Sequence, residues 1–294
     1  MTVPTFLEGA LRRALDAPGL EIVAVKAVGG GCIHNAVHVA TTGGAAFVKW
    51  NASSPPDLFL READGLEALR AAGSEIVVPK VFLAAPPTVG APGFIVMEYL
   101  PPAEGRGSTI DEALGRGLAA IHRSTADAFG FETDTYCGPT RQDNTRSTSW
   151  IEFYRDRRLR FLVDLVSAAR GLSASERRSL DRLFDRLADL LPHAPRPSLI
   201  HGDLWSGNVM ASSRGPALFD PACAYADREM EFGITTLFGG FSDGFFRAYD
   251  EAWPLPPGWR ERLPFYKLYH LLNHHLIFGG HYGAEALGIA RRYA

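Results

Sequence analysis

The chain has 294 residues, of which 46% are hydrophobic and 21% are charged, and its formal net charge is −3. This composition is typical of a globular protein that is long enough for two domains or for one two-lobed domain. The small negative charge argues against the basic surface of a nucleic-acid-binding protein, and no apolar run approaches the ~18 residues of a membrane span. We therefore predict no nucleic-acid partner and no membrane association.

The cysteine pattern points to a reducing environment. Cys32, Cys137 and Cys223 are odd in number and form no CxxC pair, which argues against a disulfide framework. Residues 1–17 lack the basic, apolar and small-residue order of a signal peptide. We therefore expect a cytoplasmic protein.

The first hundred residues predict a small lobe that is rich in β-strands. A helix is expected over 5–15, where Thr5 and Glu8 match a capping box and apolar residues follow at helical spacing. A second helix is expected over 58–72. Strand patterns occur five times, over 21–27, 37–39, 47–50, 81–83 and 94–97.

The rest of the chain predicts a larger, mainly helical lobe. Residues 101–108 are rich in Pro and Gly and mark a boundary between lobes at 1–100 and 101–294. Helices are expected over 111–124, 149–170, 173–191, 229–241 and 263–278. The predicted fold class is therefore α+β, with two lobes and a nucleotide cleft between them.

The segment 201–208 carries the clearest chemical pattern. Asp203 and Asn208 have the spacing of a kinase catalytic loop, in which the Asp receives the proton of the attacking hydroxyl and the Asn binds Mg²⁺. Asp220 follows an apolar run, where a kinase places its second metal-binding carboxylate. His201 is a candidate substrate residue, although a role in pinning the loop by hydrogen bonds explains it more simply.

A glycine-rich segment lies between the first two predicted strands. Gly29, Gly30 and Gly31, followed by Cys32, could close backbone N–H groups over phosphates. A glycine-rich hairpin turn is at least as common, so this segment alone indicates little.

Two further segments of the small lobe suit a nucleotide. Lys49 lies on a predicted strand, and Glu62 on the following helix is its expected ion-pair partner, with Glu67 as the alternative. The end of the last strand would join the lobes and present its backbone to adenine through Met97, Glu98 and Tyr99. Four histidines near the C-terminus, His270, His274, His275 and His281, lack the HExxH pattern, so we expect no metal site made from them.

Several segments, in the same order, resemble the fructosamine kinase (ketosamine-3-kinase) family. They are His-Gly-Asp-Leu-Trp-Ser-Gly-Asn at 201–208, Gly-Gly-Gly-Cys-Ile at 29–33, Phe-Val-Lys at 47–49, Asp-Pro-Ala at 220–222 and Asp-Arg-Glu at 227–229. The resemblance implies the protein-kinase-like fold shared with aminoglycoside phosphotransferases, with ATP and Mg²⁺ as cofactors. It also implies phosphorylation of the 3-hydroxyl of ketoamines, on protein lysines or small amines, which leads to deglycation.

The same resemblance implies roles for individual residues. Asp203 would be the base, Lys49 and Glu62 would form an ion pair, and Asn208 and Asp220 would bind Mg²⁺.

Three other residues carry open predictions. Trp205, directly after Asp-Leu, would present a ring face to the sugar or to its amine-bearing side, unless it is a core residue. His34 stands where the family commonly has a small residue. Cys32 predicts oxidative inactivation and a redox-linked dimer, with an inert thiol and a monomer as the alternative.

Two other functions remain open from the sequence. A kinase of the same fold could act on an aminoglycoside, choline or a hydroxyl amino acid, although the Trp-Ser-Gly insert at 205–207 counts against it. A catalytically inactive nucleotide-binding or scaffold protein is opposed by the intact set of Lys49, Asp203, Asn208 and Asp220.

Overall fold

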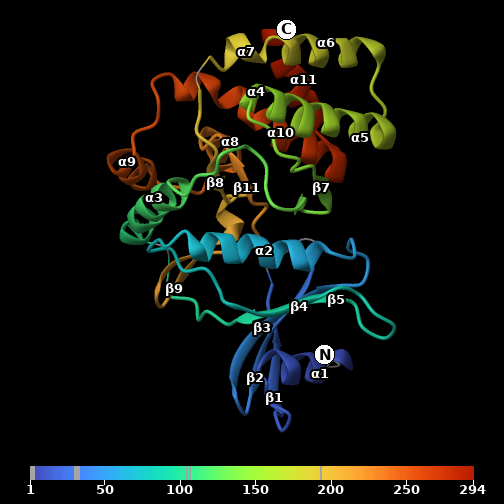
Figure 1. Cartoon of the computed structure of the whole chain (residues 1–294), viewed down its shortest axis with the longest axis vertical. Helices are drawn as coiled ribbons and strands as arrows, with labels where there is room; N and C mark the ends of the chain where they lie inside the picture. Colours follow the sequence, from blue (N-terminus) through green and yellow to red (C-terminus); the bar gives the residue numbers. More distant parts are fainter. Residues whose placement is uncertain (1–3, 30–33, 104, 106, 193) are drawn as a thin grey trace.

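The computed structural model describes residues 4–29, 34–103, 105, 107–192 and 194–294. It has the predicted α+β architecture, with a small lobe and a larger helical lobe (Figure 1). Gly30, Gly31 and Cys32 lie outside the described residues, so the phosphate loop and the redox-linked dimer stay predictions. The boundary near residue 100 stays a prediction as well.

The small lobe is one antiparallel sheet with a helix on each face (Figure 1). The strand order is β1-β2-β3-β5-β4, and every neighbouring pair is antiparallel. The strands are β1 (Ile22–Ala27), β2 (Asn35–Thr41), β3 (Gly44–Asn51), β4 (Val81–Ala85) and β5 (Gly93–Glu98). The two helices are α1 (Phe6–Ala14) and α2 (Leu58–Ala71).

Alternation along the strands decides which residues face which helix. On β5, Phe94 and Val96 pack in the cluster that contains α1, whereas Ile95 and Met97 pack in the cluster that contains α2. Successive strand residues point to opposite faces, so Lys49 on β3 shares the α2 side with its second neighbour along the strand. The Lys49 side chain therefore lies on the face of the sheet that α2 covers.

The large lobe is mainly helical (Figure 1). Its helices are α3 (Ser108–His122), α4 (Trp150–Glu152), the π-helical η1 (Phe153–Arg160), α5 (Phe161–Arg170), α6 (Ala174–Asp185), α7 (Leu187–Leu190), the 3₁₀-helical η2 (Ser206–Asn208), α8 (Glu229–Phe238), α9 (Asp243–Ala252), α10 (Trp259–Phe278) and α11 (Tyr282–Tyr293). Its short strands are β6 (Thr135–Cys137), β7 (Thr140–Gln142), β8 (Ser198–Ile200), β9 (Val209–Ser212), β10 (Gly215–Leu218) and β11 (Ala224–Ala226).

Some details differ from the sequence expectations. Helices α9 and α11 lie outside the predicted helices, and α10 begins at Trp259 rather than at 263. The predicted capping box at α1 is wrong, because Thr5 has helical backbone angles and makes no capping hydrogen bond. Glu8 instead pairs with Arg12, 2.5 Å away, one turn later on the same helix.

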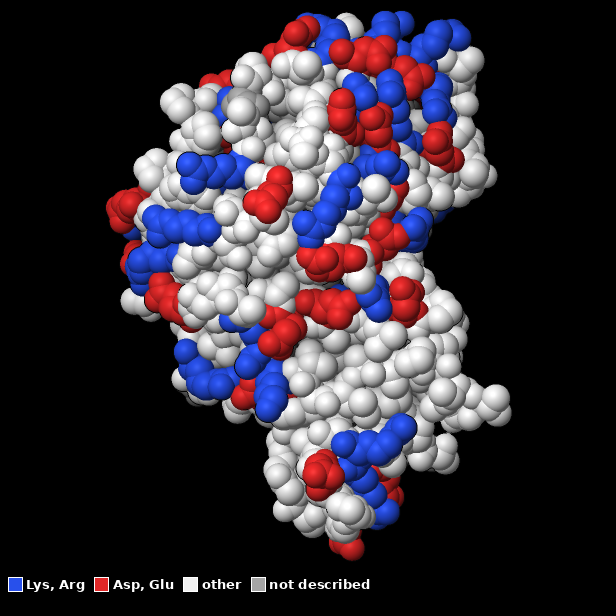
Figure 2. Space-filling model, in the orientation of Figure 1, with Lys and Arg blue, Asp and Glu red and all other residues white. Residues whose placement is uncertain are grey.

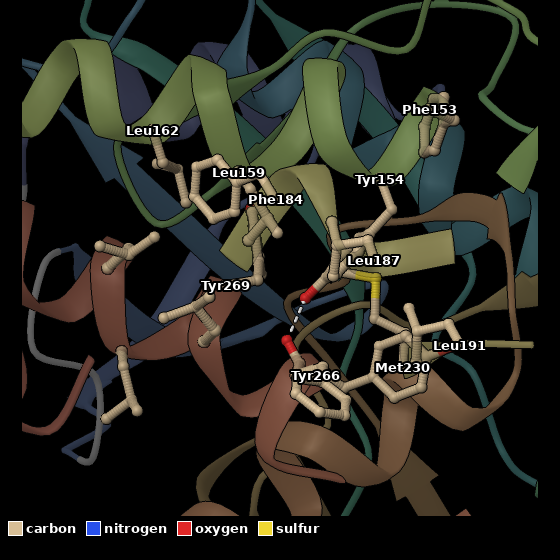
Figure 3. Packing of buried hydrophobic residues seen from close by; sticks show 14 of the residues in the cluster. Phe153, Tyr154, Leu159, Leu162, Phe184, Leu187, Leu191, Met230, Tyr266 and Tyr269 are labelled. Carbon is tan, nitrogen blue, oxygen red and sulfur yellow. Dashed lines mark hydrogen bonds between the residues drawn. The ribbon is translucent and has the colours of Figure 1, made fainter. Parts of the chain in front are cut away.

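The hydrophobic core continues across the two lobes. One cluster joins Leu58 of α2 and Ile95 of β5 to Leu118, Leu199 and Phe232 of the large lobe. A second cluster lies inside the large lobe, where Tyr154 and Leu159 of η1 pack against α6, α7 and α10 (Figure 3). Because the first cluster is shared, α2 is fixed to both lobes.

The surface carries charges of both signs. On the face shown in Figure 2, basic and acidic side chains are interleaved over the large lobe and at the lower end of the small lobe. Among the described residues, no helix combines the length and the apolarity needed to cross a membrane.

Candidate active site

Two short antiparallel ladders build the base of the site. The segment 201–208 connects β8 to β9, and Asp220 lies between β10 and β11, while β8 pairs with β11 and β9 with β10. Across the ladders the backbone N–H of Phe219 donates to the carbonyl of Asn208 at 3.1 Å, and that of Ala222 to the carbonyl of His201 at 2.8 Å. Two segments that are separate in sequence therefore meet at one place.

The turn at Gly202 has no room for a side chain. Its φ is +81°, and a Cβ at this position would lie 2.1 Å from the carbonyl oxygen of Ala222. Only glycine combines this backbone conformation with so close an approach. The turn fixes the direction in which Asp203 leaves the strand.

A buried carboxylate holds the loop from behind. Glu231 on α8 accepts hydrogen bonds from the backbone N–H groups of His201, at 2.6 Å, and of Gly202, at 3.0 Å. The ring of His201 is fully buried, with Nε2 2.8 Å from the carbonyl of Phe219 and Nδ1 3.3 Å from the N–H of Asp203. His201 therefore lies inside the loop and not on the cavity wall, so its candidate substrate role gains no support from its position.

Asp203 is held by the asparagine five residues later. The Asn208 side-chain N–H₂ donates to the backbone carbonyl of Asp203 at 2.8 Å and to its carboxylate at 3.2 Å. Burial raises the pKa of Asp203 to about 7, aided by the Asp220 carboxylate and opposed by the Asn208 hydrogen bond. A carboxylate with this pKa accepts a proton far more readily than a free Asp does.

Lys49 joins the two lobes electrostatically. Its Nζ lies 2.7 Å from Glu62 Oε1 on α2 and 2.7 Å from Asp220 Oδ1. Burial lowers the pKa of Lys49, but the carboxylates of Asp220 and Glu62 outweigh burial and raise it above its ordinary value. The predicted ion pair of Lys49 with Glu62 is confirmed. Glu67 pairs instead with Arg70, at 3.7 Å on the exposed side of α2.

Asp220 has an unusual backbone for a residue with a side chain. Its φ is +53°, in the left-handed region, where Asp is tolerated and bulkier residues are strained. Its side chain is 46% exposed and lines the cavity between the lobes. Burial acts to raise the pKa of Asp220, and Lys49 outweighs burial and lowers it below its ordinary value. The carboxylate is therefore charged when the pH is neutral.

The oxygen atoms at this place suit Mg²⁺. Both amide hydrogen bonds of Asn208 use Nδ2, and no described residue donates to its Oδ1. Asp220 Oδ1 accepts a hydrogen bond from Lys49, and no described residue donates to Asp220 Oδ2. Mg²⁺ prefers hard oxygen ligands, of which the protein supplies only a few while water supplies the others. The donor set therefore fits the ion that the sequence pattern implies.

A cavity of about 1260 Å³ lies above these residues. At one end it is lined by residues of β1 and β2, by Gly29 after β1, by Met97 and Glu98 at the end of β5, and by Tyr99 directly after it. Here the ring of His38 stacks on Tyr99 with 3.8 Å between the ring centroids. The volume exceeds that of one drug-sized ligand, so a nucleotide and an acceptor would fit together.

The other end of the cavity has an aromatic wall. Trp205 is half-buried, lines the cavity, and contacts Phe238 with ring centroids 6.3 Å apart. His274 lies against Phe238 at 4.8 Å and against Tyr282 at 5.1 Å. A Cβ on Gly207 would lie 2.3 Å from the Trp205 ring, so this glycine lets the indole fold over the loop. Trp205 is therefore a wall residue and not a core residue.

Several residues of the site were not predicted. Glu231 lies only two residues after the Asp-Arg-Glu segment at 227–229, but nothing in one sequence shows that its carboxylate turns to the loop. Tyr282 lies on α11, which was not predicted either. Cys137 on β6 contributes to the cavity beside Asp203 and was considered only for disulfide formation.

Comparison with known proteins gives a consistent result. A family model described as fructosamine kinase matches residues 10–293. The Arabidopsis thaliana "protein-ribulosamine 3-kinase, chloroplastic" is 39% identical over 283 residues, which cover 95% of this chain and 85% of that protein. The "probable ketoamine kinase" of Lactiplantibacillus plantarum is 36% identical over 278 residues, which cover 94% and 96% of the two chains.

Solved structures agree with this comparison. A Thermobifida fusca protein named as a fructosamine-3-kinase has a TM-score of 0.85 and 31% identity, with 99% of this chain and 98% of that chain covered. Aminoglycoside phosphotransferase APH(4)-Ia has a TM-score of 0.64 at 16% identity, with 99% and 100% covered, and it shows a common fold alone. From a family match over nearly its whole length and from a kinase-like set of site residues around one cavity, the chain is a phosphotransferase with the protein-kinase-like fold and belongs to the fructosamine kinase family.

Proposed function

We propose that the protein transfers the γ-phosphoryl group of ATP to the 3-hydroxyl of a ketoamine, with Mg²⁺ as the cofactor. The observation that carries this proposal is the convergence of Asp203, Asn208, Asp220 and Lys49 on one cavity, in a chain of the fructosamine kinase family. ATP as the donor is supported by that set of residues, and by related folds that were solved with AMP-PNP or ADP.

The acceptor is proposed from the family and from the names of the relatives. These names refer to ribulosamine, ketoamine and fructosamine, all of which are sugars joined to an amine as a ketoamine. After transfer to the 3-oxygen, the phosphate would leave by elimination as inorganic phosphate. Hydrolysis of the remaining adduct would free the amine. The outcome would be deglycation of protein lysines or of small amines.

In the proposed reaction the residues of the chain align the substrates, hold the metal ion and accept a proton. ATP supplies the phosphoryl group, and Mg²⁺ offsets the charge of its phosphates when both are bound. Asp203 would accept the proton of the sugar 3-hydroxyl late in the transfer, as the new P–O bond forms. Asn208 and Asp220 would hold the metal ion. The Lys49 ammonium, kept charged and in place by Glu62, would contact the phosphate oxygens.

The aromatic wall fits the other part of the substrate. A ketoamine carries a secondary amine that is protonated at neutral pH, and aromatic faces attract such cations. Trp205 lies on the same cavity as Asp203, so it would contact the sugar or its amine while the hydroxyl lies at the carboxylate. Such a contact would distinguish a ketoamine from a simple sugar.

The test is ADP release from ATP in the presence of Mg²⁺ and a fructosamine or ribulosamine of lysine. We expect turnover by the wild type and a loss on the order of 10³-fold for Asp203→Asn, which keeps the shape of the side chain but removes the base. Thermal unfolding and ATP binding should be nearly unchanged in the variant, which would show that it is folded. No turnover with either ketoamine, but turnover with an aminoglycoside or choline, would overturn the proposed acceptor.

A further inference from the structure

Three potential metal ligands, one of which is the proposed base, lie close together. Cys137 at the end of β6, Asp203 and His270 on α10 come from distant parts of the chain, yet their ligand atoms all lie within 4.8 Å of one another. The four C-terminal histidines do not form a cluster of their own among the described residues. Instead, one of them, His270, meets a thiol and a carboxylate.

Two of the three side chains are almost fully buried, and one of them has a nitrogen atom without a partner. Cys137 is 3% exposed and His270 is 1% exposed, and His270 Nδ1 has no hydrogen-bond partner among the described residues. A buried polar atom without a partner is uncommon and requires an explanation. Burial lowers the pKa of His270 to about 3, with a small further effect of His274, so its ring is neutral, as a metal ligand must be.

We propose that Cys137, His270 and Asp203 form a binding site for a thiophilic divalent cation such as Zn²⁺, and that occupation of this site inhibits the enzyme. The combination of one thiol, one imidazole and one carboxylate matches the ligand types of zinc sites. Mg²⁺ prefers oxygen ligands alone, so it remains with Asn208 and Asp220.

The geometry requires only a small adjustment. Zinc bonds of about 2.0–2.3 Å in a tetrahedral arrangement place ligand atoms about 3.5 Å apart, so the three side chains would have to close by about 1 Å. Cys137 and Asp203 both line the cavity, which leaves a fourth coordination position open to water. Burial raises the pKa of the Cys137 thiol, and coordination would displace its proton to solvent.

Inhibition follows from the position of Asp203, and this step rests on the proposed function. A carboxylate bound to zinc cannot accept the proton of the substrate hydroxyl. The cation would also occupy the space beside the carboxylate in which that hydroxyl must lie. Binding of the metal itself does not depend on the reaction and can be measured without any substrate.

The first measurement is a Co²⁺ titration of the chain without nucleotide, followed by near-ultraviolet absorption. We expect a thiolate-to-cobalt charge-transfer band at one ion per chain, displaced by Zn²⁺ and absent in Cys137→Ser. Cys223→Ser is the matched control, because Cys223 is also buried but its thiol lies against the carbonyl of Gly65 at 3.6 Å. Cys32 is present in both variants, so binding there would leave the Cys137→Ser spectrum unchanged and would overturn the proposal.

The second measurement is Zn²⁺ inhibition of turnover at saturating Mg²⁺. We expect Cys137→Ser and His270→Gln to need at least about tenfold more Zn²⁺ for half-inhibition than the wild type and Cys223→Ser. Two variants are used because either one alone could disturb folding. Equal sensitivity in all four proteins would exclude the site. If no acceptor is turned over at all, the proposed function fails, and the cobalt spectrum still decides whether the metal site exists.

Discussion

Trp205 is the residue through which we propose that the chain selects its acceptor. It follows Asp203 by two positions in the same loop. The indole is stacked over Gly207 and bordered by Phe238, and its remaining surface faces the cavity. Its contribution should therefore appear in binding of the acceptor and not in binding of the nucleotide.

We expect Trp205→Ala to raise KM for a ketoamine by about tenfold, which corresponds to the loss of roughly 1.4 kcal/mol of ring contact. KM for ATP should change by less than about twofold, because the nucleotide end of the cavity is formed by other residues. Trp205→Phe should recover most of the loss. Steady-state kinetics with each substrate varied in turn would check this, and equal increases in both KM values would exclude the ring contact.

The residues that the sequence could predict are those whose role is tied to spacing. Asp203 and Asn208 are fixed by one short segment, and Lys49 could be matched to Glu62 because strand and helix periodicity decide which side chains can meet. Cys137 and His270 could not be placed together, because 133 positions separate them in the chain and no local pattern links them. Contacts of that kind depend on the packing of β6 against α10, which propensity does not encode.

At the scale of elements, α8 supports the catalytic loop through one side chain. Glu231 receives two backbone N–H groups of the loop, whereas Glu229, one half-turn earlier on the same helix, pairs with Arg262 at 2.6 Å. Both carboxylates are buried. Glu231 thus holds the loop, whereas Glu229 stabilises the packing of α8 through Arg262.

We expect Glu231→Gln to lower kcat by about tenfold or more, because its amide would turn an N–H₂ group or a single oxygen toward two N–H donors. KM for ATP should change little. Glu229→Gln is the matched control. Both variants should lower the free energy of unfolding by about 2–3 kcal/mol, but Glu229→Gln should retain kcat. Kinetics and urea unfolding of both variants would check this. A loss of kcat in both would refute a specific role for Glu231.

The helical segment over 149–170 shows where periodicity alone is insufficient. The sequence predicts one continuous helix, but the structure has α4, the π-helical η1 and α5 in succession. The wider turns of η1 bury Arg158, which donates to the Asp143 carbonyl at 2.6 Å and to Asn144 Oδ1 at 2.5 Å. In the sequence Arg158 lies in a run of charged residues, which is typical of an exposed helix face, so its burial could not be predicted.

At the scale of the whole molecule, buried histidines make stability depend on pH. His122 on α3 is fully buried, with Nδ1 2.8 Å from the hydroxyl of Tyr249. Burial lowers the pKa of His122, against the opposing effect of Glu231. The folded pKa is therefore below the unfolded pKa of about 6.5. The contribution of His122 to the free energy of unfolding is fully present above pH 6.5 and is lost as the pH falls below that value.

We expect His122→Gln to be less sensitive to acid than the wild type. While His122 stays neutral in the folded state, each pH unit below 6.5 costs the wild type about 1.4 kcal/mol that the variant does not lose. Urea unfolding at pH 7.5 and pH 5.5, with a chelator present, would measure the difference. An equal loss in both proteins would show that His122 is charged when folded.

The shared core around α2 has a consequence for control of activity. Added to Gly65, a Cβ would lie 3.1 Å from Pro221 and 3.4 Å from the Cys223 sulfur, so the helix is seated directly on the segment that follows Asp220. Many kinases are switched off by swinging the equivalent helix outward, which separates the lysine from its glutamate. Here such a movement of α2 would separate apolar side chains that form one continuous core across the two lobes. We expect an enzyme that is permanently assembled, whose output is set by the supply of acceptor and by what else enters the cleft.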